Sequence, residues 1–405
     1  MKKLSLCLSL LLFLCCLSVK GQDSVSVQSL TAEQKIADFE YLYAVLRDNY
    51  PFFGVAERKY GVDWLAKHDE YVERVAATAD NKDYIAKLNR IINELRDGHL
   101  DIFPTVLPEY FEEIYSSAPG YKKWVKMIKR SGRRAEYWSS MFPSKPKVNV
   151  GDASRPVISF YSDSMFLEGK VAYMRIASLD MNSLIVDGEK IDRFLSSIGD
   201  ARCLVIDIQG NGGGDSHYWS KYIVPRLIET PLETPLEYEA IVLSKKGAVN
   251  KYFKPRYFGR KSYQLESQPE GGSLPAELFD GSYYCHETKE KIKPKNPVDF
   301  KGKIYLLVDG GVFSSAGIWA DFCKRTGWAT LVGKTTSTQG MGSDPAIVCL
   351  PESGILVRYP VDSGINADGT FNGETGIRPD IEISGKNRKV RLQNFLDYLS
   401  EKEDL

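Results

Sequence analysis

The sequence predicts an α/β protein with a largely parallel central sheet, preceded by a separate helical region. From about residue 169, apolar runs suited to buried strands alternate with amphipathic runs suited to helices. Residues 31 to about 105 instead show helical periodicity with little strand character. The whole chain is long enough for two domains, or for one large domain with an appended module.

The amino-terminal region, residues 30–105, is predicted to be a helical domain. Thr31 and Gln34 have the spacing of a capping box, and an apolar stripe follows them. A second amphipathic run covers 83–95 and ends in the loop RDGHLDIF, which carries His99. Residues 106–165 form a predicted linker or cap, whose basic cluster is best interpreted as a solvated face.

The core is predicted over residues 166–388. Its expected strands cover 169–180, 201–209, 238–245, 303–309, 329–335 and 354–362, its helices cover 188–200, 215–228 and 316–325, and a closing helix covers 389–405. Residues 249–300 form a polar and aromatic insertion without a clear pattern.

Residues 1–21 are predicted to be a secretory signal peptide. Two lysines precede a short apolar run, and small or permissive residues stand near the expected cleavage point. A lipid anchor is less favoured because Leu14 and Cys15 stand where a small residue should precede Cys15 or Cys16. We therefore expect a periplasmic or extracellular protein with no integral membrane segment in the mature chain.

Charge and cysteine content exclude several classes of function. The chain has 53 basic and 53 acidic residues, and removal of residues 1–21 takes away three lysines and no acids. This balance does not favour nucleic acid as a partner. Of the four cysteines after residue 21, Cys203, Cys285, Cys323 and Cys349, Cys203 and Cys323 lie in predicted core elements, as buried free thiols would. A disulfide stays open for an exported protein. No cysteine or histidine spacing indicates a zinc site, so we expect neither a metal nor a cofactor.

Two adjacent serines, Ser314 and Ser315, lie where a predicted strand turns into a helix, in DGGVFSSAGI. One interpretation is that they only cap the helix, because serine is a favoured N-cap residue. The other is that one of them is an acyl-transfer nucleophile, since free N–H groups and the helix dipole converge at such a turn. A second turn, QGNGGGD at 209–215, leaves backbone N–H groups accessible to an oxyanion.

These two turns, followed by GWATLVGKTTSTQG and GIRPDIEI, resemble in order and spacing the core of the S41 serine peptidases. That family includes tail-specific proteases, the tricorn protease and a retinoid-binding protein. LRDGH at 95–99 is similar to the tricorn-like branch, and the resemblance covers most of residues 31–384. It implies a ClpP-like or crotonase-like core. No PDZ-type loop is visible, so we expect no PDZ domain.

The resemblance implies Ser314 as nucleophile, with Ser315 as its rival. It also implies an oxyanion hole made by the N–H of Ser315 and one from Gly212 or Gly213. The acid expected three residues after the nucleophile is replaced by Gly317.

The general base is the uncertain part of the implied site. Gln339 stands at the position of the tail-specific lysine and cannot accept a proton, while Lys334 comes five residues too early. The tricorn-like branch uses a histidine that matches His99, and Gly98 replaces a frequent serine. The less favoured alternative is that His99 only caps or fills its loop. Of the other histidines, His68 and His286 look unrelated, and His217 lies close to the glycine turn.

Glu374 is the implied assisting carboxylate, displaced by one residue from its usual place, and an exposed turn acid is the plain alternative. The leading hypothesis is a secreted serine endopeptidase that cleaves a protein or peptide substrate through an acyl-enzyme. A peptidase-fold protein that only binds peptide or a small hydrophobic ligand is the alternative, and an acyl-CoA enzyme is a third hypothesis that conflicts with export. The sequence leaves the oligomeric state open.

Overall fold

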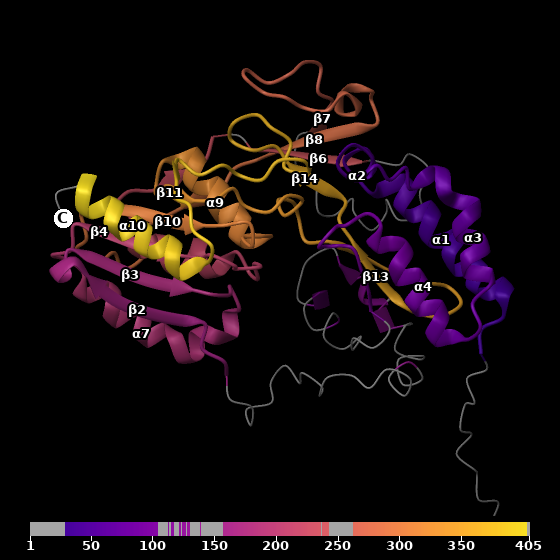
Figure 1. Cartoon of the computed structure of the whole chain (residues 1–405), viewed down its shortest axis with the longest axis horizontal. Coiled ribbons are helices and arrows are strands. Elements are labelled where there is room, and N and C mark those ends of the chain that lie inside the picture. The colour runs from indigo at the N-terminus through magenta and orange to yellow at the C-terminus, as the bar shows by residue number, and fades with distance from the viewer. Residues whose placement is uncertain are drawn as a thin grey trace, which may run out of the picture.

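The computed structural model describes residues 29–103, 157–235, 237–242 and 262–402, with isolated positions between 112 and 138. Its centre is a six-stranded sheet in the order β15-β11-β10-β4-β3-β2 (Figure 1). These strands are β2 (Tyr161–Phe166), β3 (Val171–Ile176), β4 (Cys203–Asp207), β10 (Lys303–Val308), β11 (Thr330–Gly333) and β15 (Ile381–Glu382). All neighbours pair in parallel except β2, which runs antiparallel to β3 at the edge.

Helices cover both faces of this sheet, as Figure 1 shows for α7 (Leu184–Ser197), α9 (Ser315–Thr326) and α10 (Arg388–Lys402). In β4, Leu204 and Ile206 join the apolar cluster under α7 and α9, while Cys203 and Val205 join the cluster under α10. Strands buried on both faces read as continuous apolar runs, which explains why the sequence pattern located them. The predicted α/β fold with a mostly parallel sheet is thereby confirmed.

The amino-terminal helices are α1 (Ala32–Asn49), α2 (Phe53–Tyr60), α3 (His68–Ala76) and α4 (Asn81–Asn93). The capping box of Thr31 and Gln34 is present at the start of α1. These helices share one apolar cluster with a three-stranded antiparallel sheet made of β1 (Asp101–Phe103), β13 (Leu356–Tyr359) and β12 (Ala346–Cys349). The later part of the chain therefore crosses back to complete the core of the helical region.

The strand expected at 354–362 is thus not a member of the parallel sheet. Its residues form β13, which pairs with β1, and β14 (Asp362–Gly364), which pairs with β6 (Glu237–Val242). A period of two marks a strand but carries no information about its partner, so the sequence did not distinguish the two sheets. The boundaries predicted for the helical domain and the core stay a prediction.

A second antiparallel sheet, in the order β14-β6-β8-β7, contains part of the predicted insertion. Its other strands are β7 (Ser262–Tyr263) and β8 (Tyr283–Thr288), and β5 (Leu232–Glu233) pairs with β9 (Lys291–Ile292) nearby. The helix expected at 215–228 is a π-helical turn, Tyr218–Ile223, followed by a 3₁₀ turn, Val224–Arg226, that contains Pro225. Proline lacks an N–H donor and interrupts a regular helix at that point. Further 3₁₀ turns cover Leu65–Lys67, Leu167–Gly169, Met181–Ser183 and Ala276–Phe279.

The predicted signal peptide and most of the predicted linker lie outside the described residues, as does most of the place where relatives carry a PDZ domain. No disulfide joins any two of the described cysteines, Cys203, Cys285, Cys323 and Cys349, and the first three are buried. Across the described ranges, we find no helix with both the length and the apolar character needed to cross a bilayer.

A charged link ties the closing helix to the turns that follow β4 and β10. Arg391 of α10 is buried and forms an ion pair with Asp309 and a hydrogen bond to Gln209. Asp309 in turn accepts N–H bonds from Gly210 at 2.8 Å and from Gly311 at 3.0 Å. Both glycine-rich turns are therefore fixed by one carboxylate, which depends on one guanidinium from α10.

We predict that Arg391→Met lowers the free energy of unfolding by about 3 kcal/mol, because it leaves the carboxylate of Asp309 without its cation. The control is Lys389→Met, an exposed change on the same helix that should cost less than about 0.5 kcal/mol. Urea unfolding of both variants measures the difference. Equal losses would show that the ion pair adds nothing to stability.

Candidate active site

Ser314 stands at the N-cap of α9 with its backbone in an unusual conformation. Its φ is 54° and its ψ is −131°, a region that non-glycine residues rarely occupy, and its side chain makes no capping hydrogen bond. Such a conformation costs about 1–3 kcal/mol and persists only where the surrounding fold imposes it. The hydroxyl instead lies 3.1 Å from Nε2 of His99, which is 215 residues away in the sequence. The N-cap interpretation is therefore wrong for the Ser314 side chain.

Ser315 occupies a different environment although it is the next residue. It is buried, and its hydroxyl accepts a hydrogen bond from the hydroxyl of Ser216 at 3.0 Å. The two serines therefore point to different partners, and it is Ser314 that meets the imidazole.

His99 lies in the loop between α4 and β1. Its backbone N–H donates to Oδ1 of Asp97 at 2.7 Å, and Oδ2 of the same carboxyl group accepts a bond from the hydroxyl of Tyr50 at 3.0 Å. Tyr50 is the C-cap residue of α1 and is fully buried. Asp97 thereby joins the His99 loop to the end of α1. The His99 ring packs against the ring of Phe313, with 4.4 Å between their centroids.

The surroundings keep the imidazole neutral. Burial, with a further contribution from the positive charge of Arg358, lowers the pKa of His99 to about 4. An interaction with the backbone of Gln339 works in the opposite direction and raises that pKa. A neutral imidazole can accept a proton, so His99 is a base across the physiological pH range.

The glycine turn after β4 lies directly against Ser314. A Cβ on Gly213, whose φ is 101°, would stand 2.8 Å from Cβ of Ser314, so only glycine fits there. The N–H of Gly213 already donates to Oδ1 of Asn211 at 2.9 Å. The N–H of Gly212 has no hydrogen-bond partner within the described ranges, and nothing lies within 4 Å of where its Cβ would be. The N–H of Ser315 begins α9 and has no acceptor within the helix.

Glu374 lies apart from His99. Its carboxylate forms an ion pair with Arg58 of α2, which also binds Glu277 at 2.6 Å. No hydrogen bond joins Glu374 to His99 in the part of the chain that the structure describes. A partner in α2, far away in the sequence, was not visible from the motif around Glu374.

Gln339 is 4% exposed and has a φ of 64°. Its Nε2 finds no hydrogen-bond partner within the described ranges. The residue after it, Gly340, packs on the nucleophile turn, since a Cβ there would lie 2.7 Å from the backbone N of Ser314. The tail-specific lysine position therefore does lie at the site.

The remaining candidates lie elsewhere or have other partners. His217 is exposed and pairs with Asp215 at 3.1 Å, while His68 pairs with Glu40 at 3.0 Å. His286 is buried within β8. Lys334 is exposed. Gly317 is buried in the first turn of α9, and nothing lies within 4 Å of where its Cβ would be. Packing at the Cβ position therefore does not explain why a glycine replaces the acid that the resemblance implies.

Two residues of the site were not recognised from the sequence, Asp97 and Phe313. The motifs RDGH and GGVFSS contain them, but only the fold shows that one supports the His99 loop and the other packs on it. Phe313 also explains Gly98, because a Cβ on Gly98 would lie 3.0 Å from Cζ of the Phe313 ring. A serine at 98, frequent in the resembling family, would crowd this ring and require it to shift slightly.

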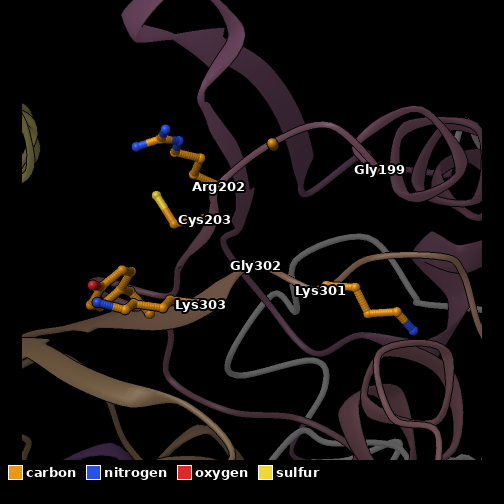
Figure 2. Close-up of a pocket in the computed structure, with 8 residues that line it drawn as sticks. Gly199, Arg202, Cys203, Lys301, Gly302 and Lys303 are labelled. Carbon is orange, nitrogen blue, oxygen red and sulfur yellow. The ribbon is translucent and has the colours of Figure 1, made fainter. Parts of the chain in front are cut away.

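A pocket of about 420 Å³ lies at the opposite end of the sheet (Figure 2). It is lined by Gly199, Ala201, Arg202, Cys203, Lys301, Gly302, Lys303 and Tyr305. Cys203 and Lys303 are the first residues of β4 and β10, whereas the site at Ser314 follows the carboxyl ends of those strands. The pocket is thus separate from the site, and Lys301 at its rim already pairs with Glu229 and Asp299.

The carboxyl group of Asp97 should make stability depend on pH. Burial raises its pKa to about 7, although the N–H of His99 and the Tyr50 hydroxyl oppose that rise. Since the ordinary value is about 3.9, the folded state holds a proton that the unfolded state releases, so stability is lost as the pH rises toward 7. When the pH is raised from 5 to 8, deprotonation of Asp97 should lower the free energy of unfolding by roughly 3 kcal/mol.

We predict that Asp97→Asn removes this part of the pH dependence. Urea unfolding of wild type and variant at pH 5 and pH 8 isolates the contribution of residue 97, because all other groups cancel in the difference. Parallel pH dependences would contradict a raised pKa for Asp97.

Solved structures of other proteins share this fold. A putative peptidase from Parabacteroides merdae superimposes with a TM-score of 0.55 at 16% identity, over 90% of this chain and 96% of that one. Mature CPAF gives 0.53 at 16% identity, over 91% and 96%. A Chlamydia pneumoniae protein, CPj1016/CpB1054, is 28% identical over 111 residues, which are 27% of this chain and only 18% of that relative. The model of peptidase family S41 matches residues 170–383, more than half of the sequence, and this chain therefore belongs to peptidase family S41.

Proposed function

We propose that this protein is a secreted serine endopeptidase that uses Ser314 as nucleophile and His99 as general base. The observation that carries the proposal is the 3.1 Å approach of Ser314 Oγ to His99 Nε2. Membership of a peptidase family and the neutral imidazole support it. Export rests on the sequence of residues 1–21 alone.

In the proposed reaction, the Ser314 hydroxyl attacks the peptide carbonyl carbon and its proton passes to Nε2 of His99. The new Oγ–C bond gives a tetrahedral intermediate, whose negative oxygen accepts bonds from the N–H groups of Ser315 and Gly212. Gly213 shapes this turn but has its own N–H committed to Asn211. As the C–N bond breaks, the imidazolium donates its proton to the leaving amine.

Water then hydrolyses the acyl-enzyme by the same route. It gives a proton to Nε2 of His99 as its oxygen attacks the ester carbon. The imidazolium then returns that proton to Oγ of Ser314 as the Oγ–C bond breaks. The proposed chemistry uses only side chains and backbone groups of this chain. The substrate is a protein or peptide, which we place between the helical region and the sheet.

The alternative is a protein that binds peptide or a small hydrophobic ligand without cleaving it. The ion pair of Glu374 with Arg58 favours this alternative, because it leaves the proposed His99 base without the expected carboxylate. Acylation of Ser314 separates the two functions.

We predict that a fluorophosphonate forms a covalent adduct on Ser314 of the wild type, detected by mass spectrometry of the digested protein. Ser314→Ala should abolish the adduct, whereas Ser315→Ala should still carry it on Ser314, because the Ser315 hydroxyl faces Ser216. Lactacystin, which is found in complex with mature CPAF, serves as a second probe. A folded wild type that neither reacts nor cleaves a mixed peptide pool would favour the binding function.

We also predict that the acid limb of kcat/KM lies near pH 4, the pKa of the His99 base. Arg358→Gln should move this limb to higher pH, because it removes a positive charge that disfavours the imidazolium. The shift should be partial, since burial is the larger cause. Lys334→Gln, an exposed change, is the matched control. A limb near pH 6.5 in the wild type would show that burial does not lower the pKa of the working base.

A further inference from the structure

A groove of about 490 Å³ lies between the π-helical turn at 218–223 and the start of the segment that leads from β9 to β10. Its apolar lining includes Pro225, Pro294 and the buried side chain of Ile292. The charged residues that line it are four exposed lysines, Lys221, Lys291, Lys293 and Lys295. Among the described residues, none that lines the groove is acidic.

Three of these lysines are presented by one extended segment. KIKPK at 291–295 alternates lysine with Ile292 and Pro294, and successive side chains of an extended chain point to opposite sides. The burial agrees, since the lysines are exposed and Ile292 is 1% exposed. Pro294 keeps the residue before it extended, and the N–H of Lys295 donates to the carbonyl of Pro225 at 2.9 Å. The lysines therefore stand about 7 Å apart along a fixed backbone.

The positive charge of the groove is only partly balanced. Two of its lysines have a carboxylate within 4.0 Å, in the pairs Lys291–Glu233 and Lys221–Glu290. Glu233 is itself shared with Lys289, at 3.2 Å. Lys293 and Lys295 form no ion pair with any residue of the described ranges. The groove thus keeps a net positive charge at neutral pH, and two of its cations have no local carboxylate.

The other wall of the groove is joined to α9. The N–H of Ser220 donates to the carbonyl of Ser216 at 2.9 Å, and the hydroxyl of Ser216 donates to the hydroxyl of Ser315 at 3.0 Å. Next to Ser220, Trp219 stacks on Trp319 of α9, with 5° between the ring planes. A ligand in the groove is therefore held in a fixed relation to the turn that carries the nucleophile.

We propose that this groove is an exosite that binds an acidic stretch of the protein substrate, apart from the bond that is cleaved. The inference rests on the proposed function, since it names a feature of the substrate of that same site. Side chains on one side of an extended peptide are about 7 Å apart, so alternating glutamates match the spacing of the lysines. The apolar lining accommodates the aliphatic stems of these glutamates and the side chains between them.

Other anions fit the groove less well. Phosphate groups are bound best by the planar fork of arginine, and no arginine lines the groove in the part of the chain that the structure describes. A membrane surface would require exposed apolar anchors beside the lysines. The large apolar side chains that are exposed in the described ranges lie outside the groove, and they are Ile158, Met165, Met181 and Ile185.

A kinetic experiment compares two peptide substrates that share one cleavable sequence, taken from the cleavages found in the mixed peptide pool. A flexible linker joins this sequence to Glu-Leu-Glu-Leu-Glu in one substrate and to Gln-Leu-Gln-Leu-Gln in the other. We expect the acidic tag to lower KM about tenfold, with kcat within about twofold, because it adds binding without touching the reacting bond.

Charge reversal locates the effect. In Lys293→Glu/Lys295→Glu the advantage of the acidic tag should vanish, whereas the substrate with the neutral tag should keep its kcat/KM. The matched control is Lys386→Glu/Lys389→Glu, the same change of charge at exposed positions at the start of α10, which covers the opposite face of the sheet. The control should keep the advantage. Thermal unfolding shows whether each variant is folded.

Binding to Ser314→Ala separates the exosite from catalysis. Fluorescence anisotropy of labelled Glu-Leu-Glu-Leu-Glu should show saturable binding to this protein. Adding the two charge reversals at 293 and 295 should raise Kd about tenfold or more, because two attractive pairs become repulsive. Affinity should also fall when the NaCl concentration is raised from about 50 mM to about 300 mM.

Three outcomes would overturn the inference. The first is an equal KM for both tags in a wild type that cleaves them. The second is an equal loss in the groove variant and in the α10 control, which would assign the effect to net charge. The third is sedimentation with phosphatidylserine vesicles that depends on Lys293 and Lys295, without any peptide binding. Absence of a Ser314 adduct in the wild type is a separate result that would contradict the proposed function, and anisotropy would still decide whether the groove binds acidic peptide.

Discussion

The packing of Phe313 between Gly98 and Gly340 is the contact on which the arrangement of the site depends. His99 follows the last amino-terminal helix, whereas Ser314 follows β10 of the parallel sheet. The two side chains meet only if the two parts of the chain are held in a fixed relation. The Phe313 ring packs against the backbones of Gly98 and Gly340, and neither backbone can shift without losing close contacts. This packing therefore fixes the two parts of the chain relative to each other. The return of β12 and β13 to the core of the helical region adds a second attachment.

Besides Arg96 in the His99 loop, two non-glycine residues near His99 have positive φ, Ser314 at 54° and Gln339 at 64°. Each is disfavoured by about 1–3 kcal/mol, so each needs support from its surroundings. Ser314 is supported by the start of α9 and by the glycine turns, which the Asp309–Arg391 ion pair holds in place. Behind Gln339 lies the buried Asn366–Asn372 pair. The strain is therefore balanced by buried side-chain pairs whose oxygens also accept bonds from the backbone N–H groups of these turns.

The elements that the sequence predicted are those determined by local pattern. β4 and β10 are apolar on both faces, and the turns after them need glycine, so the parallel sheet and the place of Ser314 followed from short stretches. His99 was identified through resemblance, and the structure places it within hydrogen-bonding distance of Ser314. The partner of Glu374 was not predictable, because Arg58 lies 316 residues earlier and neither residue carries a pattern that points to the other. For the same reason, the pairing of β13 with β1 was not predictable.

The environment of His99 sets what kind of base it can be. A carboxylate beside the ring would stabilise the imidazolium and raise the pKa of His99, whereas here burial and Arg358 lower that pKa to about 4. Such an imidazole stays neutral and ready over a wide pH range, but it is a weaker base for the Ser314 hydroxyl. In the proposed reaction, more of the stabilisation of the transition state then comes from the backbone N–H groups of Ser315 and Gly212. The rigidity of the glycine turns and the electrostatics of the base are thus two parts of one arrangement.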